Sequence, residues 1–407
     1  MKPRGKWLTP FNIISIPIIL LGIILLWIRF TKGLSAVTNL SQDFPWGLWI
    51  GLDVNVGVAF AGGAYVLTFM VYILGLKKYH CLLRVTILNA FLAYVFYAGA
   101  LLFDLGRPWN IVNPIIGNSF GVSSVLFLVA WHFLLYMIAA LIEFSPAIAE
   151  WLGLQRVRKF LARLTVTAVI FGITLSTLHQ AGLGAVFLMA KAKLHPLWYS
   201  EFIPILFFIS SIFAGLSMII LEGSISDRIF ANHLNTEDLK PRHDLMFDIA
   251  RVCAGVMFIY LFLQALIFAH EKRGVYIGSP MGWWYLTEIL GFVFVPCLLF
   301  ILSMKRKSLI LVRISAIMAL IGIILNRLNV SIIAFRWNAP LRYYPSWMEI
   351  EITLAIVFAE IWVFRWFVSR MPVLETPPTW ALEQDARARN AKHPEIVKEV
   401  VSWKPQT

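Results

Sequence analysis

The chain has 407 residues, of which 59% are hydrophobic and only 14% are charged, and its mean hydropathy is +0.77. This composition excludes a soluble domain with an ordinary charged surface, so we expect a polytopic membrane protein. The net charge of +13 does not indicate a nucleic-acid partner, because the Lys and Arg residues fall in short loops between apolar runs.

Apolar runs of about 20 residues, each long enough to cross a bilayer, recur along the whole chain. They cover residues 11–30, 50–76, 84–103, 121–143, 160–178, 202–222, 246–269, 283–303, 309–329 and 347–369. The first run has no small-residue cleavage site after it, so we interpret it as a retained span rather than a signal peptide. The sequence therefore predicts an all-α protein with about ten transmembrane helices, located in the cell (inner) membrane.

Positive charge is concentrated in alternate connections: before the first run and after the second, fourth, sixth and eighth. Such connections face the cytoplasm in membrane proteins, so we expect both termini to be cytoplasmic. Hydrophobicity stops after Arg370. We therefore expect a membrane domain over residues 1–370 and a polar cytoplasmic tail over 371–407, with at most one short helix around 380–391.

The remaining connections are longer, rich in Trp, Pro and Gly, and are expected to face outward. In the stretch 175–200 we expect the helix to end so that His179 and Gln180 lie at the membrane surface. Gly182 and Gly184 would then allow a turn or the close approach of a ligand. An imidazole there can exchange protons at neutral pH, although an ordinary interfacial loop is an equal alternative.

Ionisable residues also occur inside the predicted spans, where a charge costs ~2.5–3.5 kcal/mol at mid-membrane and needs a partner, a cavity or a proton path. Near the outer ends of several helices, and expected to form one polar pocket, are Asp53, Asp104, Arg107, His179, Glu288, Arg327 and Glu349. The alternative is a set of salt bridges that only pin the helices together.

Three ionisable residues lie deeper, toward the cytoplasm: His132, Glu143 and Glu222. His132 and Glu143 share one face of a predicted helix and are about 16 Å apart along it, so they could line one polar track. The alternatives are an interfacial role for Glu143 and a backbone hydrogen bond for His132.

Metal and haem ligands are scarce in this chain. Cys81, Cys253 and Cys297 are isolated, so neither an iron–sulfur cluster nor a disulfide framework is expected. A transmembrane haem b needs two axial histidines on different helices, and His132 has no evident mate at its depth. We expect no haem, with a pairing of His179 with His195 or His270 left open.

Several motifs carry a resemblance to a known family. In chain order they are FPWGLWIGLD (44–53), DLGRPWN (104–110), SVLF (124–127), LIEFSPA (141–147), TLHQAGLG (177–184), KLHPLWYS (193–200), LEGS (221–224) and YPSW (344–347). In order and spacing these resemble the NrfD/PsrC family of quinone-interacting membrane subunits. The HybB-type branch, with hydrogenase-2-like, DsrP-like and HmcC-like membrane subunits, is the most similar.

The resemblance implies paired four-helix bundles with flanking helices, a quinone site near the outer face and, in most members, no haem. It also implies a four-cluster ferredoxin-type iron–sulfur partner on that face. One position departs from the pattern: Leu128 stands where the hydrogenase-type relative has Glu. A buried acid proposed for proton conduction is thus missing, and His132, one turn further on, could substitute. The chain could therefore equally be the membrane subunit of a sulfite-reduction-associated, high-molecular-weight cytochrome or quinone-reductase complex.

We therefore expect an integral membrane subunit that exchanges electrons between a menaquinone-type pool and an extracytoplasmic iron–sulfur partner in an anaerobic respiratory complex. Further catalytic or multihaem cytochrome subunits would complete that complex, and the chain would act as a quinone/quinol oxidoreductase only within it. Coupling to proton translocation is an open part of this expectation. The expected residues are His179, Asp104 and Asp53 for catalysis; His179, Gln180, Gly182, Trp109, Arg107 and Trp198 for quinone binding; and His132, Glu143 and Glu222 for a proton path.

Two other functions compete with this one. A secondary transporter would also need many helices and buried charges, but it commonly has matching broken helices at mid-membrane in its two halves, and no such pair is evident. A passive anchor for a redox enzyme would not need the deep His132, Glu143 and Glu222.

Overall fold

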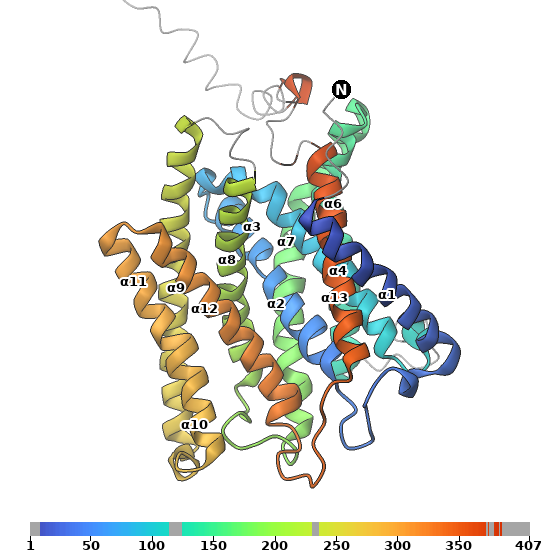
Figure 1. Ribbon diagram of the computed structural model, residues 1–407. Helices are drawn as coiled ribbons and strands as arrows, with labels where there is room; N and C mark the ends of the chain where they lie inside the picture. The colour runs from blue at the N-terminus through green and yellow to red at the C-terminus, as the bar shows by residue number, and fades with distance from the viewer. Residues whose placement is uncertain are drawn as a thin grey trace, which may run out of the picture.

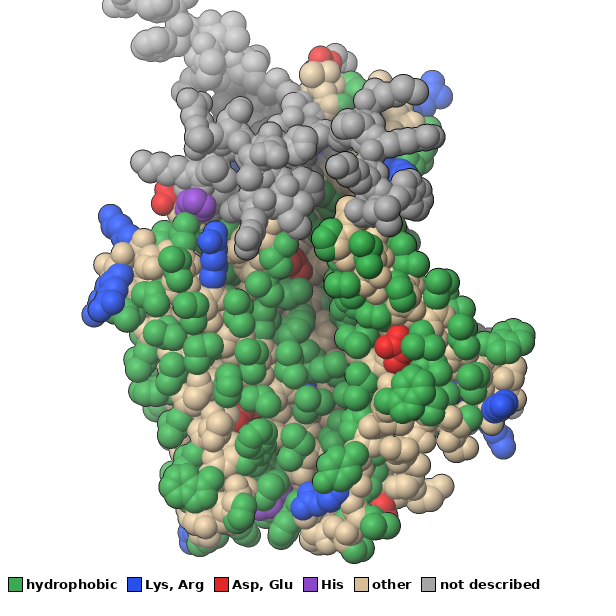
Figure 2. Space-filling view, in the orientation of Figure 1, with side chains coloured by type: hydrophobic (Ala, Val, Ile, Leu, Met, Phe, Trp, Pro, Cys, Tyr) green, Lys and Arg blue, Asp and Glu red, His purple; other side chains and the backbone are tan. Residues whose placement is uncertain are grey.

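The computed structural model describes residues 9–113, 124–229, 236–371, 373, 378–381 and 383–384. Among these residues, ten helices are long and apolar enough to cross a membrane, which confirms the predicted all-α, multi-pass fold. Hydrophobic side chains cover most of the visible face between the two ends of the molecule, as a lipid-facing surface requires (Figure 2).

Each predicted apolar run corresponds to one helical span. In chain order the spans are α1 (Pro10–Lys32); Trp49–Ile73, made of η2 (Trp49–Gly57), α2 (Val58–Ala61), α3 (Gly63–Thr68) and η3 (Phe69–Ile73); α4 (His80–Asp104); α6 (Val125–Trp151); α7 (Gln155–Val186), continued by η6 (Phe187–Ala190); α8 (Ile203–Ile229); α9 (Thr236–His270); α10 (Pro280–Leu286), continued by η9 (Thr287–Phe294) and α11 (Val295–Arg306); α12 (Leu309–Leu328), continued by η10 (Asn329–Ile333); and α13 (Trp347–Arg370).

The spans pack as two groups of four with two flanking helices (Figure 1). The Trp49–Ile73 span, α4, α6 and α7 form the first bundle. The second bundle consists of α8, α9, the α10–α11 span and α12. Helices α1 and α13 pack against each other, and α13 also contacts α4 and η2 of the first bundle.

The two ends of the bundles differ in their connections. One end, which we call the cationic end, carries the short connections 74–79, 152–154 and 307–308 together with the end of α13 (Figure 1). The other, which we call the loop end, carries the long connections 33–48, 105–113, 187–202, 271–279 and 334–346. The positively charged Lys2, Arg4 and Lys6, which entered the orientation prediction, lie outside the described residues.

Small residues allow close helix packing where the groups meet. A Cβ atom built on Gly215 of α8 would lie 1.8 Å from the backbone nitrogen of Gly63 on α3, so the two backbones touch at this crossing. Similarly, a Cβ on Gly22 of α1 would lie 2.3 Å from Cβ of Ala355 on α13. Close backbone approach of this kind is a main source of attraction between helices in lipid.

Helix α7 differs from the prediction in a way that matters for the site. It does not end near Leu178 but continues to Val186, so His179 and Gln180 lie within the helix, 2% and 1% exposed. The expectation that these two residues surface at the membrane edge is therefore wrong. Gly182 and Gly184 do not form a turn; Cβ atoms there would lie 2.8 Å from Val129 Cγ2 and from the Ile203 carbonyl oxygen, respectively. The glycines serve close packing of α7 on its neighbours.

Part of the predicted polar tail packs on the membrane domain. Met371, Val373 and Ala381 are buried, and the Gln384 side-chain nitrogen donates to the Gln155 carbonyl oxygen at 3.3 Å. A helical turn includes residues 379–381, and the remainder of the helix predicted around 380–391, from residue 385 onward, lies outside the described residues.

Candidate functional site

His179 lies inside the first bundle, with its ring packed against two aromatic rings. The ring centroids of Tyr94 on α4 and Phe133 on α6 are 5.6 and 5.7 Å away. The Nδ1 atom of His179 is 3.1 Å from the carbonyl oxygen of Val129. Because a carbonyl oxygen only accepts, this contact requires the proton on Nδ1. The Nε2 atom is buried and has no hydrogen-bond partner in the protein.

Other polar atoms in the first bundle are also buried without a partner. Gln180 donates from Nε2 to the Val58 carbonyl oxygen at 2.7 Å, which leaves its Oε1 atom unpaired. Among the described residues, the set on the four spans of this bundle is Asn55 Nδ2, Tyr94 Oη, Asp104 Oδ1, His132 Nδ1, Glu143 Oε1, Ser176 Oγ, His179 Nε2 and Gln180 Oε1. Buried polar groups are nearly always paired, so these atoms indicate places along the first bundle, from Asp104 near the loop end to Glu143 near the cationic end, that bind water or a polar ligand.

Asp53 lies on η2, where the helix is wound as a π-helix, a form that is frequent at functional sites. Its side chain is buried, and Thr353 of α13 donates to its Oδ2 atom at 3.3 Å. Asp53 and Asp104 interact electrostatically, so the structure brings these two predicted residues together.

Arg29 of α1 positions the end of α4 that carries Asp104. Its Nε atom donates to the Phe103 carbonyl oxygen at 2.7 Å, and its Nη2 atom donates to the Leu105 carbonyl oxygen. The guanidinium is buried and also interacts electrostatically with Asp104. Helix α1 therefore contributes directly to the acidic part of the first bundle.

Glu360 of α13 is a functional candidate that the sequence analysis did not single out. It is buried, and Tyr97 of α4 donates to its Oε2 atom at 3.0 Å. The sequence contained one indication of it. Glu360 follows Glu349 by eleven residues, a spacing that places both residues on one face of a helix.

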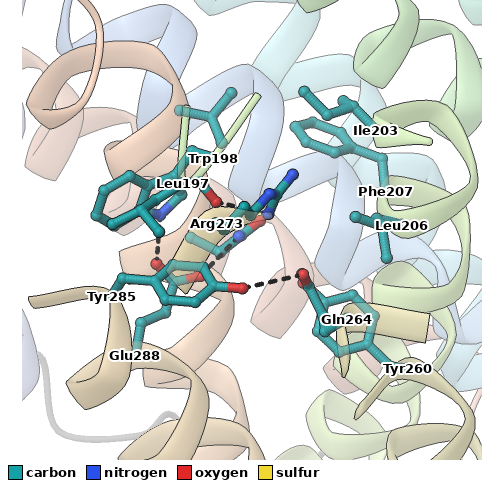
Figure 3. Close-up of a pocket in the computed structure, with 12 residues that line it drawn as sticks. Leu197, Trp198, Ile203, Leu206, Phe207, Tyr260, Gln264, Arg273, Tyr285 and Glu288 are labelled. Atoms are coloured by element: carbon teal, nitrogen blue, oxygen red, sulfur yellow. Dashed lines mark hydrogen bonds between the residues drawn. The ribbon is translucent and has the colours of Figure 1, made fainter. Parts of the chain in front are cut away.

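A second polar cluster lies in the second bundle, centred on Glu288 of η9 (Figure 3). Trp198 donates from Nε1 to Glu288 Oε2 at 2.7 Å, Asn326 donates to Oε1 at 2.7 Å, and Asn329 donates to Oε2 at 2.5 Å. A cavity of about 20 Å³ adjoins these groups. The structure therefore places Trp198, predicted to bind quinone with His179, in this cluster beside Glu288.

Arg327 and Glu349 make contacts that satisfy most of their polar atoms. Arg327 donates to Ser210 Oγ at 2.8 Å and to Asn326 Oδ1 at 2.7 Å, and its guanidinium lies 3.5 Å from the Phe207 ring centroid. Glu349 forms a capping box with Ser346 at the start of α13. The ionisable residues near the loop end thus belong to separate clusters rather than to the single pocket that we expected.

Arg107 and Trp109 lie on the short helix η5 (Pro108–Val112) and its N-cap, at the loop end. Both are exposed, and the Trp109 side chain is 71% exposed. The structure therefore presents these two predicted quinone ligands at the surface.

The three residues of the predicted proton path occupy different surroundings. His132 lies on α6 one turn after Val129, whose carbonyl oxygen contacts His179. Glu222 of α8 accepts a hydrogen bond from Asn89 of α4. Glu143 lines a cavity of about 200 Å³ near the cationic end, where Arg84 and Arg158 also lie. Both arginines pair with Glu150, at 2.6 and 3.0 Å.

The fold and the site define a multi-pass membrane protein whose first bundle holds a group of buried, titratable side chains. The sequence profile described as "Polysulphide reductase, NrfD" matches residues 36–337. The chain therefore belongs to the NrfD family. The matched range begins after α1 and ends before α13.

Similar proteins cover nearly the whole chain. It is 42% identical to a protein of Nitratidesulfovibrio vulgaris (strain Hildenborough), over 92% of this chain and 96% of that protein. It is 30% identical to the probable Ni/Fe-hydrogenase 2 b-type cytochrome subunit of Escherichia coli K12, over 92% of this chain and 94% of that subunit. It is 26% identical to the integral membrane subunit of menaquinone reductase from N. vulgaris, over 79% and 81% of the two chains.

Proposed function

We propose that this chain is the integral membrane subunit of an anaerobic respiratory complex, in which it exchanges electrons between a menaquinone-type pool and an extracytoplasmic iron–sulfur partner subunit. The observation that carries the proposal is the group of unpaired polar atoms around His179, in a chain that belongs to the NrfD family. A near full-length relative named as a hydrogenase subunit and a further relative named as a menaquinone reductase subunit support it.

The quinone headgroup would bind beside His179 and Gln180, and it supplies two-electron, two-proton chemistry when bound. With the proton on Nδ1, His179 Nε2 offers a lone pair that can accept a proton from a quinol hydroxyl. In the reverse direction, protonated Nε2 donates to a quinone oxygen. Gln180, the next residue of α7, has a further buried acceptor without a partner, Oε1. Asp104 and Asp53 would exchange the proton with water at the loop end.

The loop end would face outward and would carry the iron–sulfur partner, while the termini would be cytoplasmic. The positive charge at the cationic end supports this orientation. Large exposed hydrophobic side chains at the loop end, including Trp109 at 71%, Leu341 at 81% and Tyr344 at 73%, support the docking of a protein there. Mass spectrometry of the intact complex would identify that partner and any further catalytic or cytochrome subunits.

We also propose that the chain binds no haem of its own. Haem b in a bundle needs two axial histidines and a flat space for the porphyrin between them. His270 is exposed at the end of α9, and His195 lies in the connection 187–202, so neither contacts His179.

A proton path from the cationic end toward the quinone site is a further part of the proposal. Glu143 would take up protons from the cavity that it lines, and His132 would pass them toward His179. Glu143 and His132 are eleven residues apart, about 16 Å along α6, so water molecules would have to bridge them. Glu222 would serve a separate branch on the other side of α4, through Asn89.

The proposal is tested with His179→Ala and Asp104→Asn variants in the isolated complex. We expect each to lower quinone-linked electron transfer about 10²-fold or more, because each removes a positioned proton donor or acceptor. His270→Ala, which removes an exposed imidazole at the same end of the molecule, is the matched control. Normal assembly with full quinone-linked activity in both test variants would refute the site.

A further inference from the structure

One face of α13 carries three polar residues toward the first bundle. Glu349, Thr353 and Glu360 follow one another at intervals of four and seven residues, so they form a single stripe along the helix. All three side chains are buried, although α13 is a flanking helix and lies beyond the part of the chain that the family profile matches.

Each residue of this stripe has a hydrogen bond with a polar group of the first bundle. Trp49 of η2 donates from Nε1 to the Glu349 carbonyl oxygen at 3.2 Å, and Thr353 donates to Asp53 at 3.3 Å. Glu360, two turns further along α13, accepts the hydrogen bond from Tyr97. The flanking helix thus connects the acids at the loop end with the middle of α4.

Tyr97 lies at the centre of the connection. Its ring packs directly on η2, since a Cβ atom built on Gly57 would lie 2.3 Å from Tyr97 Cε2. The phenol interacts electrostatically with Asp53, Glu360 and Glu222. Glu222 in turn accepts from Asn89, which lies on the same helix as Tyr97.

The resulting line of polar groups follows α4 through much of the membrane. Along this helix, Asp104, Tyr97 and Asn89 are seven and eight residues apart, so the line covers about 22 Å at 1.5 Å per residue. The hydrocarbon core of a bilayer is about 30 Å thick. Glu222, at the far end of the line, is half-buried.

We propose that Glu360 and Tyr97 form a proton relay that connects Asp53, near the loop end, with Glu222, toward the cationic end. This relay rests on the function proposed above and is separate from the branch through His132 and Glu143. In each transfer, the O–H bond of Tyr97 breaks as its proton moves to Glu360 Oε2, and a new O–H bond forms on Tyr97 with a proton from the Glu222 side. Glu360 then releases its proton toward Asp53 through bridging water, because Thr353, the residue that donates to Asp53, lies seven residues or about 10 Å from Glu360 along α13. Charge balances and no electron is involved.

A purely structural role explains these contacts less well. Acids are expensive inside a membrane helix, and here the hydrogen-bond partners of Asp53, Glu222 and Glu360 are the neutral side chains of Thr353, Asn89 and Tyr97. Acids at this depth without a cationic partner are expected to line a cavity or a proton path. A line of such acids with a hydrogen-bonded phenol between them is what a relay needs.

The test uses the intact complex reconstituted in lipid vesicles, with a short-chain menaquinone analogue and a viologen dye as electron donor. Glu360→Gln and Tyr97→Phe keep the shape of each side chain and remove its titrating group. Glu351→Gln is the matched control, because Glu351 lies nine residues before Glu360 and therefore on the opposite face of α13. Proton movement, electron transfer and the KM for the quinone analogue are measured for each.

We expect both test variants to slow proton movement about 10²-fold. Electron transfer slows by the same factor if it is tightly coupled to proton movement. We expect the KM for the quinone analogue to stay unchanged, since the quinone site proposed above lies at His179 and does not include Glu360 or Tyr97. The control behaves as the wild type. The relay is overturned if the Glu360→Gln variant moves protons at the same rate as the wild-type complex. It is also overturned if the wild-type complex transfers electrons without moving protons. No dye-to-quinone electron transfer in the wild type would instead overturn the proposed function.

Discussion

His179 and His195 show at the level of single residues how hydrogen bonds decide what an imidazole can do. In His179, Nδ1 faces a carbonyl oxygen and must carry the proton, which leaves Nε2 as the reactive atom. In His195, Nδ1 accepts from the Leu197 backbone N–H at 3.2 Å, so the proton lies on Nε2. The two histidines of one predicted stretch are therefore opposite tautomers: the free Nε2 is an acceptor in His179 and an N–H donor in His195. Only the Nε2 of His179 is among the unpaired polar atoms of the first bundle.

The loop-end connection that holds His195 should lose stability as the pH falls. Burial lowers the pKa of His195 from its ordinary value, among the rings of Trp198, Tyr276 and Trp337. The unfolded chain therefore takes up a proton more readily than the folded one. The contribution of the neutral His195 side chain to the free energy of unfolding is fully present above the ordinary pKa of about 6.5. It is lost as the pH falls from there toward the lower pKa of the folded protein.

The measurement is thermal unfolding of the purified protein across that pH range, for the wild type and for His195→Asn, whose amide oxygen can replace Nδ1 as acceptor. We expect the difference in stability between the two to shift in favour of the variant as the pH falls. A difference that stays constant with pH would show that His195 does not titrate on unfolding.

At the scale of helices, small residues and flanking elements determine how the polar groups meet. The α3–α8 crossing joins the two bundles at Gly63 and Gly215. Helix α1 contributes Arg29 at the end of α4, and α13 contributes Thr353 and Glu360 beside Asp53 and Tyr97. The flanking helices therefore contact the candidate site directly, although the family match does not include them.

Replacement of Gly215 by Val should separate the two bundles at this crossing. Its Cβ would overlap the backbone of Gly63, which cannot move without shifting α3, so we expect a loss of about 1–3 kcal/mol or more. Gly255→Ala on α9 is the control, since a Cβ there meets nothing within 4 Å. Thermal stability in detergent gives the comparison; equal stability of Gly215→Val and the control would contradict the close crossing.

The whole molecule combines two bundles that carry different polar centres. The first holds buried groups with unpaired atoms around His179 and acids that interact with one another. In the second, the Glu288 carboxylate accepts from three donors, as a structural polar centre would. This contrast is the reason to assign redox and proton chemistry to the first bundle.

A spectroscopic prediction follows for the chain as a whole. Separated from any cytochrome partners, it should show no b-type band in a reduced-minus-oxidised spectrum, because neither His195 nor His270 contacts His179 as a second axial ligand would require. The test matters because one relative is named as a b-type cytochrome subunit. A stoichiometric haem b band retained by the purified chain would contradict this prediction, and its loss in His179→Ala would identify the ligand.

The sequence by itself determined the ten spans, the membrane location and the family, because the hydrophobic length of a span and the order of motifs are local properties that survive without tertiary contacts. It also indicated the candidate ionisable residues, since such residues are rare inside apolar runs. Only the tertiary structure decided their grouping. The polar run at His179 and Gln180 looked like a helix end, yet neighbouring helices surround it and α7 continues. Trp198 proved to belong with Glu288, and Glu360 with Tyr97, because a side chain's partners come from helices far apart in sequence, whose rotation and depth no single run specifies.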